Sequence, residues 1–182
     1  MRSSLLIALL ALTSACGPRE PGFAPHEQLS WRIESSEVTF DRCSDADFWR
    51  EPFAAPDVST GAFYISVAID ETGREALLMR CNGFNACSVA QPEVRFTVAG
   101  TELVHGSNSR LDIQNSSCKV AVAEGIVIVD EGATMTLQNS LTFTLVENDA
   151  ACVDFEANVR GQSPNGLGVD GCVVTVHMRG SL

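Results

Sequence analysis

The sequence predicts an all-β fold, an antiparallel sandwich or barrel of about eight to ten strands stabilised by disulfides. Three observations support this prediction. Short segments in which apolar and polar residues alternate recur along the chain, and turn residues separate them. No sustained helical period occurs anywhere after residue 15. Six cysteines follow Cys16, an even number that suits a disulfide framework.

The first half of the predicted sheet begins near Trp31 with a strand that ends near Cys43. Residues 62–69 alternate regularly, and an acidic turn at 70–73 leads into a further strand at 75–81, so we expect a hairpin. Between the strand that ends near Cys43 and the strand at 62–69, several acids lie beside two aromatic residues. The glycine and the alternate-residue ligands of an EF-hand are absent, so we interpret this segment as a solvated turn with an aromatic anchor. These residues are Asp45, Asp47, Phe48, Trp49 and Glu51.

The second half continues the pattern. Residues 94–98 alternate, and short strands are expected near Leu103 and Leu111. Residues 118–129 are apolar at both parities, which predicts a strand covered on both faces. Alternation at 153–160 and at 174–178 predicts the last two strands, with 161–171 as their connecting loop.

The clearest period of two runs from residue 133 to residue 145. Only Asn139 interrupts its apolar register, and the parity requires one long strand or an odd-length loop. Neighbouring residues of a strand point to opposite faces, which divides this segment into two sets. We expect Met135, Leu137, Leu141, Phe143 and Leu145 to face the interior, and Thr134, Thr136, Thr142 and Thr144 to face solvent or a polar lumen.

The N-terminus has the layout of a secretory signal, with Arg2, an apolar run over 5–12 and small residues before Cys16. The run is too short for a transmembrane helix, which needs about 20 residues. Ser14-Ala15-Cys16 resembles the lipobox of bacterial lipoproteins. The resemblance implies that 1–15 is a signal peptide and that Cys16 is lipidated as the mature N-terminus. The alternative is an ordinary signal peptide cut nearby, with Cys16 incidental.

Residues 16–29 are rich in proline and glycine and predict a lipidated N-terminus with a flexible tether, followed by one all-β domain over 30–182. Gly17 after the lipidated cysteine resembles the sorting pattern of Gram-negative outer-membrane lipoproteins. This resemblance implies a lipid-anchored protein of the cell envelope, at the outer membrane and facing the periplasm or the surface.

The cysteines beyond Cys16 predict three disulfides in an oxidising compartment. Only one pairing, Cys81 with Cys87, is proposed, because Asn82-Gly83 between them favours a tight reversal. Cys152 and Cys172 lie on unlike parities of their strands, so a bridge between these two is not assigned. No Cys-x-x-Cys spacing occurs and no histidine is close in sequence to a cysteine, so no metal is expected. The full set is Cys43, Cys81, Cys87, Cys118, Cys152 and Cys172.

The net charge of −11, with Lys119 the only lysine, disfavours nucleic acid as a partner. The same acidity means that membrane attachment is expected to come from acyl chains rather than from a basic patch. An envelope protein or a small apolar ligand remains as a possible partner.

No catalytic constellation or cofactor motif is found. Residues 161–165 come nearest to G-x-S-x-G but lack the second glycine, and 166–168 is interpreted as a turn. His105 and His177 are interpreted as strand or loop residues, and Asp154 with Glu156 as part of a solvated face. The sequence therefore favours a non-enzymatic binding or scaffolding module over the alternative, an extracytoplasmic hydrolase.

In size, anchoring and strand richness the chain resembles bacterial lipocalins and related calycin barrels. The Gly-x-Trp signature of that family is missing, because Trp31 follows Leu29-Ser30, so no ligand residue is transferred. The resemblance implies a small apolar ligand carrier, which an apolar pocket beneath Phe143 and Met135 would favour. The chain is also similar to uncharacterised cysteine-containing envelope lipoproteins, which imply no activity. A closed core with an exposed aromatic patch near Phe48 and Trp49 would instead favour a protein partner.

Overall fold

A computed structural model describes residues 19–55, 57–58, 63–81, 87–89, 93–113, 117–146 and 150–182. Residues 1–18, with the predicted signal peptide and Cys16, lie outside the described part, as do residues 82–86, where a tight reversal was predicted, and the side chains of Phe48 and Arg80. The described strands are β1 (Gln28–Asp41), β2 (Tyr64–Ile69), β3 (Glu75–Cys81), β4 (Cys87–Val89), β5 (Arg95–Ala99), β6 (Glu102–Asp112), β7 (Lys119–Asp130), β8 (Thr134–Leu145) and β9 (Val173–Ser181). The helical elements are α1 (Asp47–Arg50), the 3-10 helix η1 (Glu51–Phe53) and α2 (Ala150–Gln162).

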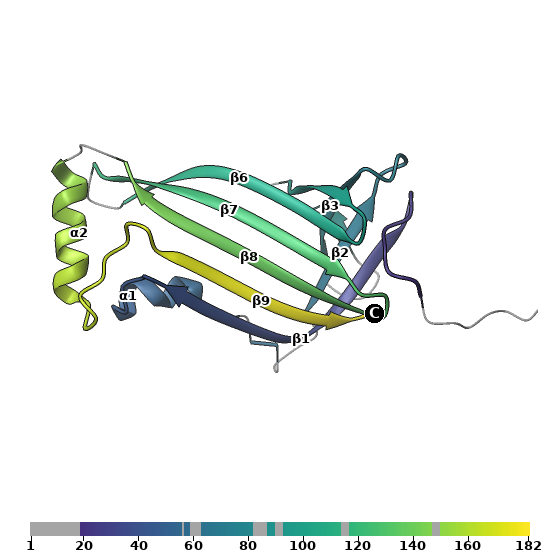
Figure 1. Ribbon diagram of the computed structural model, residues 1–182, viewed down its shortest axis with the longest axis horizontal. Coiled ribbons are helices and arrows are strands. Elements are labelled where there is room, and N and C mark those ends of the chain that lie inside the picture. Colours follow the sequence, from purple (N-terminus) through teal and green to yellow (C-terminus); the bar gives the residue numbers. More distant parts are fainter. Residues whose placement is uncertain are drawn as a thin grey trace, which may run out of the picture.

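Eight antiparallel strands close into a barrel in the order β1-β9-β8-β7-β6-β5-β3-β2, with β2 pairing back onto β1 (Figure 1). Strand β4 pairs with β3 outside this ring. The predicted all-β fold is confirmed, and of the two predicted architectures the chain forms the barrel. The predicted hairpin is the β2–β3 pair.

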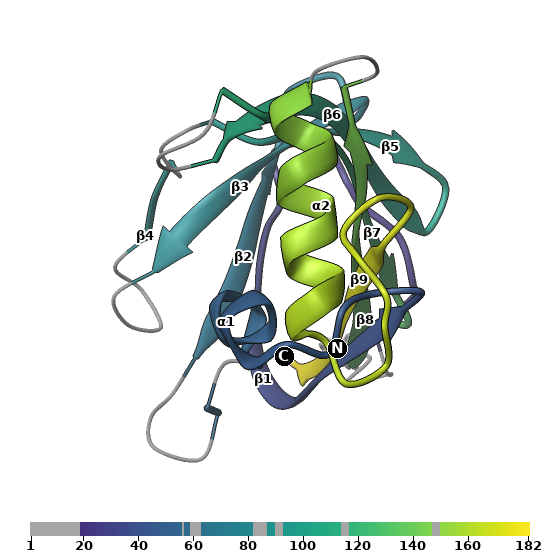
Figure 2. The ribbon, with the colours of Figure 1, turned by 90° about the vertical axis from the view of Figure 1, so that its left-hand side faces the viewer.

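The strands of the barrel differ in length. Strands β1, β6, β7, β8 and β9 are long, whereas β2, β3 and β5 have only 5 to 7 residues each. Consequently β1 pairs with β2 only over its first residues, Gln28 to Arg32, and β6 pairs with β5 only over Glu102 to Val104. Strands therefore close one half of the barrel, while at the other end α2 lies across the opening beside α1 (Figure 2).

The helix α2 corrects two predictions, the strand over 153–160 and the lack of any helical period. Its buried residues, Cys152, Glu156 and Val159, recur at the spacing of one helix face. Glu156 occupies the middle of that face and accepts hydrogen bonds from the Val169 backbone N–H (2.8 Å) and from Arg160 Nε (3.0 Å). A charged residue at the centre of the buried face hid the helical pattern in the sequence.

Strand β8 has the predicted facing and is one long strand. Met135, Leu137 and Phe143 are buried, and Leu141 and Leu145 pack against the core beneath α2. On the opposite face Thr134 and Thr144 are exposed and Thr136 and Thr142 half-buried. The two short strands expected near Leu103 and Leu111 are instead the single strand β6.

The interior contains two apolar clusters. The first fills the half that strands close and includes Trp31, Val67, Phe96, Leu103, Ile128 and Met135. The second lies beneath α1 and α2 and includes Trp49, Cys118, Val120, Phe143, Val159 and Val174. The barrel is thus packed at both ends of its long axis.

Three disulfides are present, as predicted, and Cys81–Cys87 is the pair proposed from the sequence. Cys118–Cys152 attaches α2 to the segment before β7, and Cys43–Cys172 joins the end of β1 to the start of β9. These last two pairs had been left open, and Cys152, expected on a strand, lies on α2.

The segment before β1 differs from the flexible tether predicted through residue 29. From Arg19 on it lies against the barrel, where Arg19 and the Gly22 backbone N–H both bond to the carboxylate of Asp130 at the end of β7. Phe23 packs onto the first apolar cluster. These contacts fix residues that a proline-rich composition alone marks as unstructured.

Candidate functional site

A cavity of about 370 Å³ lies inside the barrel. It occupies the region where the short strands end and η1 takes their place. Its walls come from β2, β3, β5, β7, β8, β9 and η1, so residues far apart in the sequence meet there. The described lining residues are Pro52, Phe53, Ala54, Phe63, Ile65, Leu78, Phe96, Ile126, Leu137, Asn139, Val176 and Met178.

The cavity lies close to the place that the sequence analysis named. Leu137 and Asn139 line it from β8, and these residues stand between Met135 and Phe143 on the inward face of that strand. Phe63 lines it just before β2 and is 39% exposed, so the cavity reaches the surface beside this ring.

Three aromatic rings pack together where the cavity adjoins the cluster beneath α2. The Phe53 ring lies 5.7 Å from the Trp49 ring and 5.6 Å from the Phe143 ring, and Trp49 and Phe143 are 5.2 Å apart in an edge-to-face arrangement. Such geometry is favourable for aromatic pairs. Trp49 is buried and anchors its segment, which forms α1 and η1 rather than the predicted solvated turn. Its ring does not contribute to the exposed patch predicted near Phe48 and Trp49, and the Phe48 side chain lies outside the described part.

Polar side chains cross the inner face of three adjacent strands. Asn139 Nδ2 donates to Glu124 Oε1 (3.1 Å), and Ser107 Oγ donates to Glu124 Oε2 (3.2 Å). Because a carboxylate is an acceptor only, Glu124 fixes which end of the Asn139 amide it contacts. The remaining atom, Asn139 Oδ1, is buried and has no hydrogen-bond partner in the structure.

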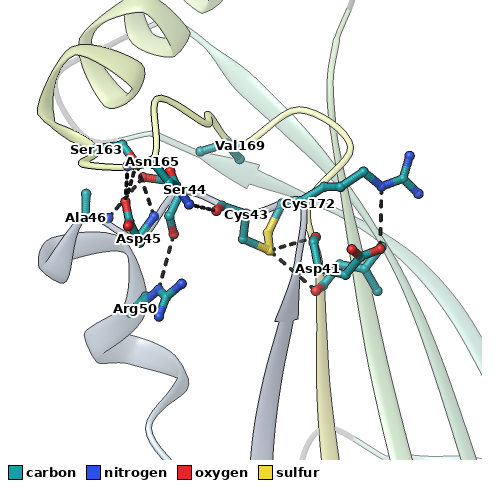
Figure 3. The surroundings of a disulfide bond; sticks show 12 residues. Asp41, Cys43, Ser44, Asp45, Ala46, Arg50, Ser163, Asn165, Val169 and Cys172 are labelled. Carbon is teal, nitrogen blue, oxygen red and sulfur yellow. Dashed lines mark hydrogen bonds and ion pairs between the residues drawn. A yellow bond between two sulfur atoms is a disulfide. The ribbon is translucent and has the colours of Figure 1, made fainter.

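The segment that contains α1 and η1 lines one side of the cavity. Hydrogen bonds hold the start of this segment against the loop after α2 (Figure 3). Asp45 Oδ1 accepts hydrogen bonds from Ser163 Oγ (2.6 Å) and from the Asn165 backbone N–H (3.0 Å). These bonds, the Ser163 bond first, lower the pKa of Asp45. The nearby Cys43–Cys172 disulfide and the Asn165 Nδ2 bond to the Cys43 carbonyl hold the start of α1 in place.

The remaining candidates of the sequence analysis lie apart. His105 Nδ1 is 2.7 Å from the Arg95 carbonyl oxygen, and His177 is exposed on β9. Asp154 and Glu156 lie on α2, where Glu156 is buried rather than part of a solvated face. Within the described ranges, no three His, Cys, Asp or Glu side chains gather as metal ligands.

The cavity lining was not predicted as a site, and its one sequence signal was Asn139, the polar residue that interrupts the apolar register of β8. The chain matches no protein-family model, no curated protein and no solved structure.

Proposed function

We propose that the protein is a lipoprotein of the cell envelope, anchored through Cys16, and that its barrel is a non-enzymatic binding module for a small, mainly apolar molecule. The observation that supports this proposal is the cavity inside the barrel, whose described lining is apolar except for Asn139.

The size of the cavity suits a small molecule. Ligand sites commonly measure about 300–1,000 Å³. An apolar cavity of about 150 Å³ holds benzene, so one of this size suits about 10 to 15 non-hydrogen atoms. Burial of the apolar surface of such a molecule against the apolar lining would provide most of the affinity.

Binding of a ligand is also a better account than scaffolding or hydrolysis. Trp49 is buried, so its ring offers no exposed aromatic surface to a protein partner. A hydrolase would need a base hydrogen-bonded to a nucleophilic side chain, whereas the described hydrogen bond of His105 goes to a backbone carbonyl.

The envelope location rests on the N-terminal resemblance and gains support from the three disulfides, which persist in oxidising compartments. In the described part of the chain, neither helix is long and apolar enough to cross a bilayer. Replacing Cys16 with Ser should release the exported protein from the membrane fraction. A Cys16→Ser protein that still sediments with membranes would refute the anchor.

A cavity-filling variant tests the binding function. Val176 lines the cavity from β9, whereas the next residue, His177, is exposed on the outer face of the same strand. We expect naphthalene to bind the wild-type protein in calorimetric titrations, Val176→Phe to abolish this binding by filling the space, and His177→Phe to leave it unchanged. Equal naphthalene affinity in the wild type and in Val176→Phe would refute the cavity as the site.

A further inference from the structure

We infer that the cavity selects a neutral ligand with an apolar body and one hydrogen-bond donor, and that this donor bonds to Asn139 Oδ1. The inference rests on the proposed function, because it names the class of ligand for the same cavity. A hydroxyl or an amide N–H attached to a hydrocarbon or aromatic body has this chemistry.

The position of Asn139 carries the argument. Among the described lining residues it is the one polar side chain, and it sits on β8 between Leu137 and Leu141. Polar groups that are few and well placed in an apolar pocket are what orient a ligand. A buried acceptor without a partner is costly, so a ligand that supplies a donor gains more affinity there than at an acceptor bonded to water.

The amide has a defined orientation. Glu124 Oε1 accepts a hydrogen bond from Asn139 Nδ2, and Glu124 Oε2 accepts one from Ser107 Oγ. The amide nitrogen of Asn139 therefore already has a hydrogen-bond partner, and the amide oxygen is left for a ligand. The last side-chain torsion of asparagine is soft, so a small rotation lets a buried Oδ1 meet a donor in the cavity.

The same contacts disfavour an anion. Apart from Asn139 the described lining is apolar, and burying a charge in such surroundings is costly. The nearest charged group along the hydrogen-bond chain is the carboxylate of Glu124, which repels a second negative charge. A fatty-acid-like carboxylate is therefore a poorer match than the corresponding alcohol.

Three probes with one ring system separate these properties: 2-naphthol donates a hydrogen bond, 2-methoxynaphthalene does not, and 2-naphthoate is an anion. We expect calorimetric titrations of the wild-type protein at neutral pH to give a dissociation constant for 2-naphthol about tenfold lower than that for 2-methoxynaphthalene, the effect of one well-placed hydrogen bond. We expect 2-naphthoate to bind most weakly.

Two variants test the assigned residue. Asn139→Leu should abolish the preference for 2-naphthol while 2-methoxynaphthalene still binds. Gln138→Leu removes an amide from the outward-facing neighbour and should leave the preference intact. Glu124→Gln is a nearly isosteric change to the positioning residue, and it should reduce the preference because glutamine can donate to Oδ1 and occupy it.

The outcomes are distinct. Equal binding of the two neutral probes by the wild type, tightest binding of 2-naphthoate, or an unchanged preference in Asn139→Leu would each overturn the inference and leave the cavity as a ligand site. Failure of all three probes to bind would overturn the proposed function and the inference together. The wild-type comparison decides the matter even if Asn139→Leu does not fold.

Discussion

Arg19 Nη1 lies 2.6 Å from Asp130 Oδ2, and the Asp130 side chain is completely buried whereas that of Arg19 is 25% exposed. The same carboxylate also accepts from the backbone N–H groups of Gly22 (2.6 Å) and Gly132 (3.1 Å). This pair fastens the N-terminal segment to the turn between β7 and β8.

Loss of the ion pair between Arg19 and Asp130 should reduce the free energy of unfolding. Arg19→Leu removes a bond between two charged groups, and we expect a loss of about 2 kcal/mol, since hydrogen bonds to charged groups contribute about 1.5–3 kcal/mol. Arg42 provides a matched control, because it pairs with Asp41 at a site where both side chains are more than two-thirds exposed. Arg42→Leu should change stability little. Equal losses of unfolding free energy for both variants in urea titrations would contradict a stabilising role of the Arg19–Asp130 pair.

A second prediction concerns acid. The pKa of Asp70 is lowered from 3.8 to about 2, first by the Thr72 hydroxyl (2.6 Å) and then by the backbone N–H groups of Glu75 and Arg74. A carboxylate with a lowered pKa stabilises the folded state above its unfolded pKa, and this contribution disappears as the pH falls through the folded value. The stabilisation from Asp70 is therefore complete above about pH 4 and is lost between about pH 4 and pH 2.

Unfolding at a series of pH values tests this contribution. Asp70→Asn should lose less stability than the wild type between those two pH values, because its side chain does not titrate. Glu71→Gln changes an exposed carboxylate in the same turn and serves as the control. Thr72→Val should raise the pKa of Asp70 in a nuclear magnetic resonance titration. An unchanged Asp70 pKa in Thr72→Val would show that the hydroxyl does not cause the shift.

The strands were predictable because a period of two needs only local information, as β8 illustrates with Met135 and Phe143 inside. The helix α2 was not, since Glu156 occupies the centre of its buried face, and the carboxylate is bonded there by Arg160 and by the backbone N–H of Val169 in the loop after the helix. The cavity was predictable only as a possibility. It depends on how far β2 and β5 extend along their longer neighbours, and strand lengths of this kind follow from pairing across the whole barrel.

A third prediction ranks the disulfides. In the chain-entropy account, a disulfide that closes a longer loop constrains the unfolded chain more. The sequence separations are 129 for Cys43–Cys172, 34 for Cys118–Cys152 and 6 for Cys81–Cys87. Replacing each pair with serines should cost about 5, 4 and 2 kcal/mol respectively. Chemical denaturation of the three double variants measures the order, and a Cys81/Cys87 variant that loses the most stability would contradict it.

A fourth prediction compares neighbours on β8. Phe143 is 2% exposed and packs edge-to-face against Trp49 and Phe53, whereas Thr142 is half-buried on the opposite face. Phe143→Ala should lower the free energy of unfolding by about 3–5 kcal/mol, because it loses the transfer free energy of the ring and leaves a void. Thr142→Ala should cost far less. Phe53 packs against Phe143 and also lines the cavity, so Phe143→Ala removes a support of the cavity wall and should in addition weaken naphthalene binding. Thr142→Ala should leave this binding unchanged. Equal losses of stability for the two variants in a denaturant titration would refute the facing of β8 and, with it, the position of Asn139 in the cavity wall.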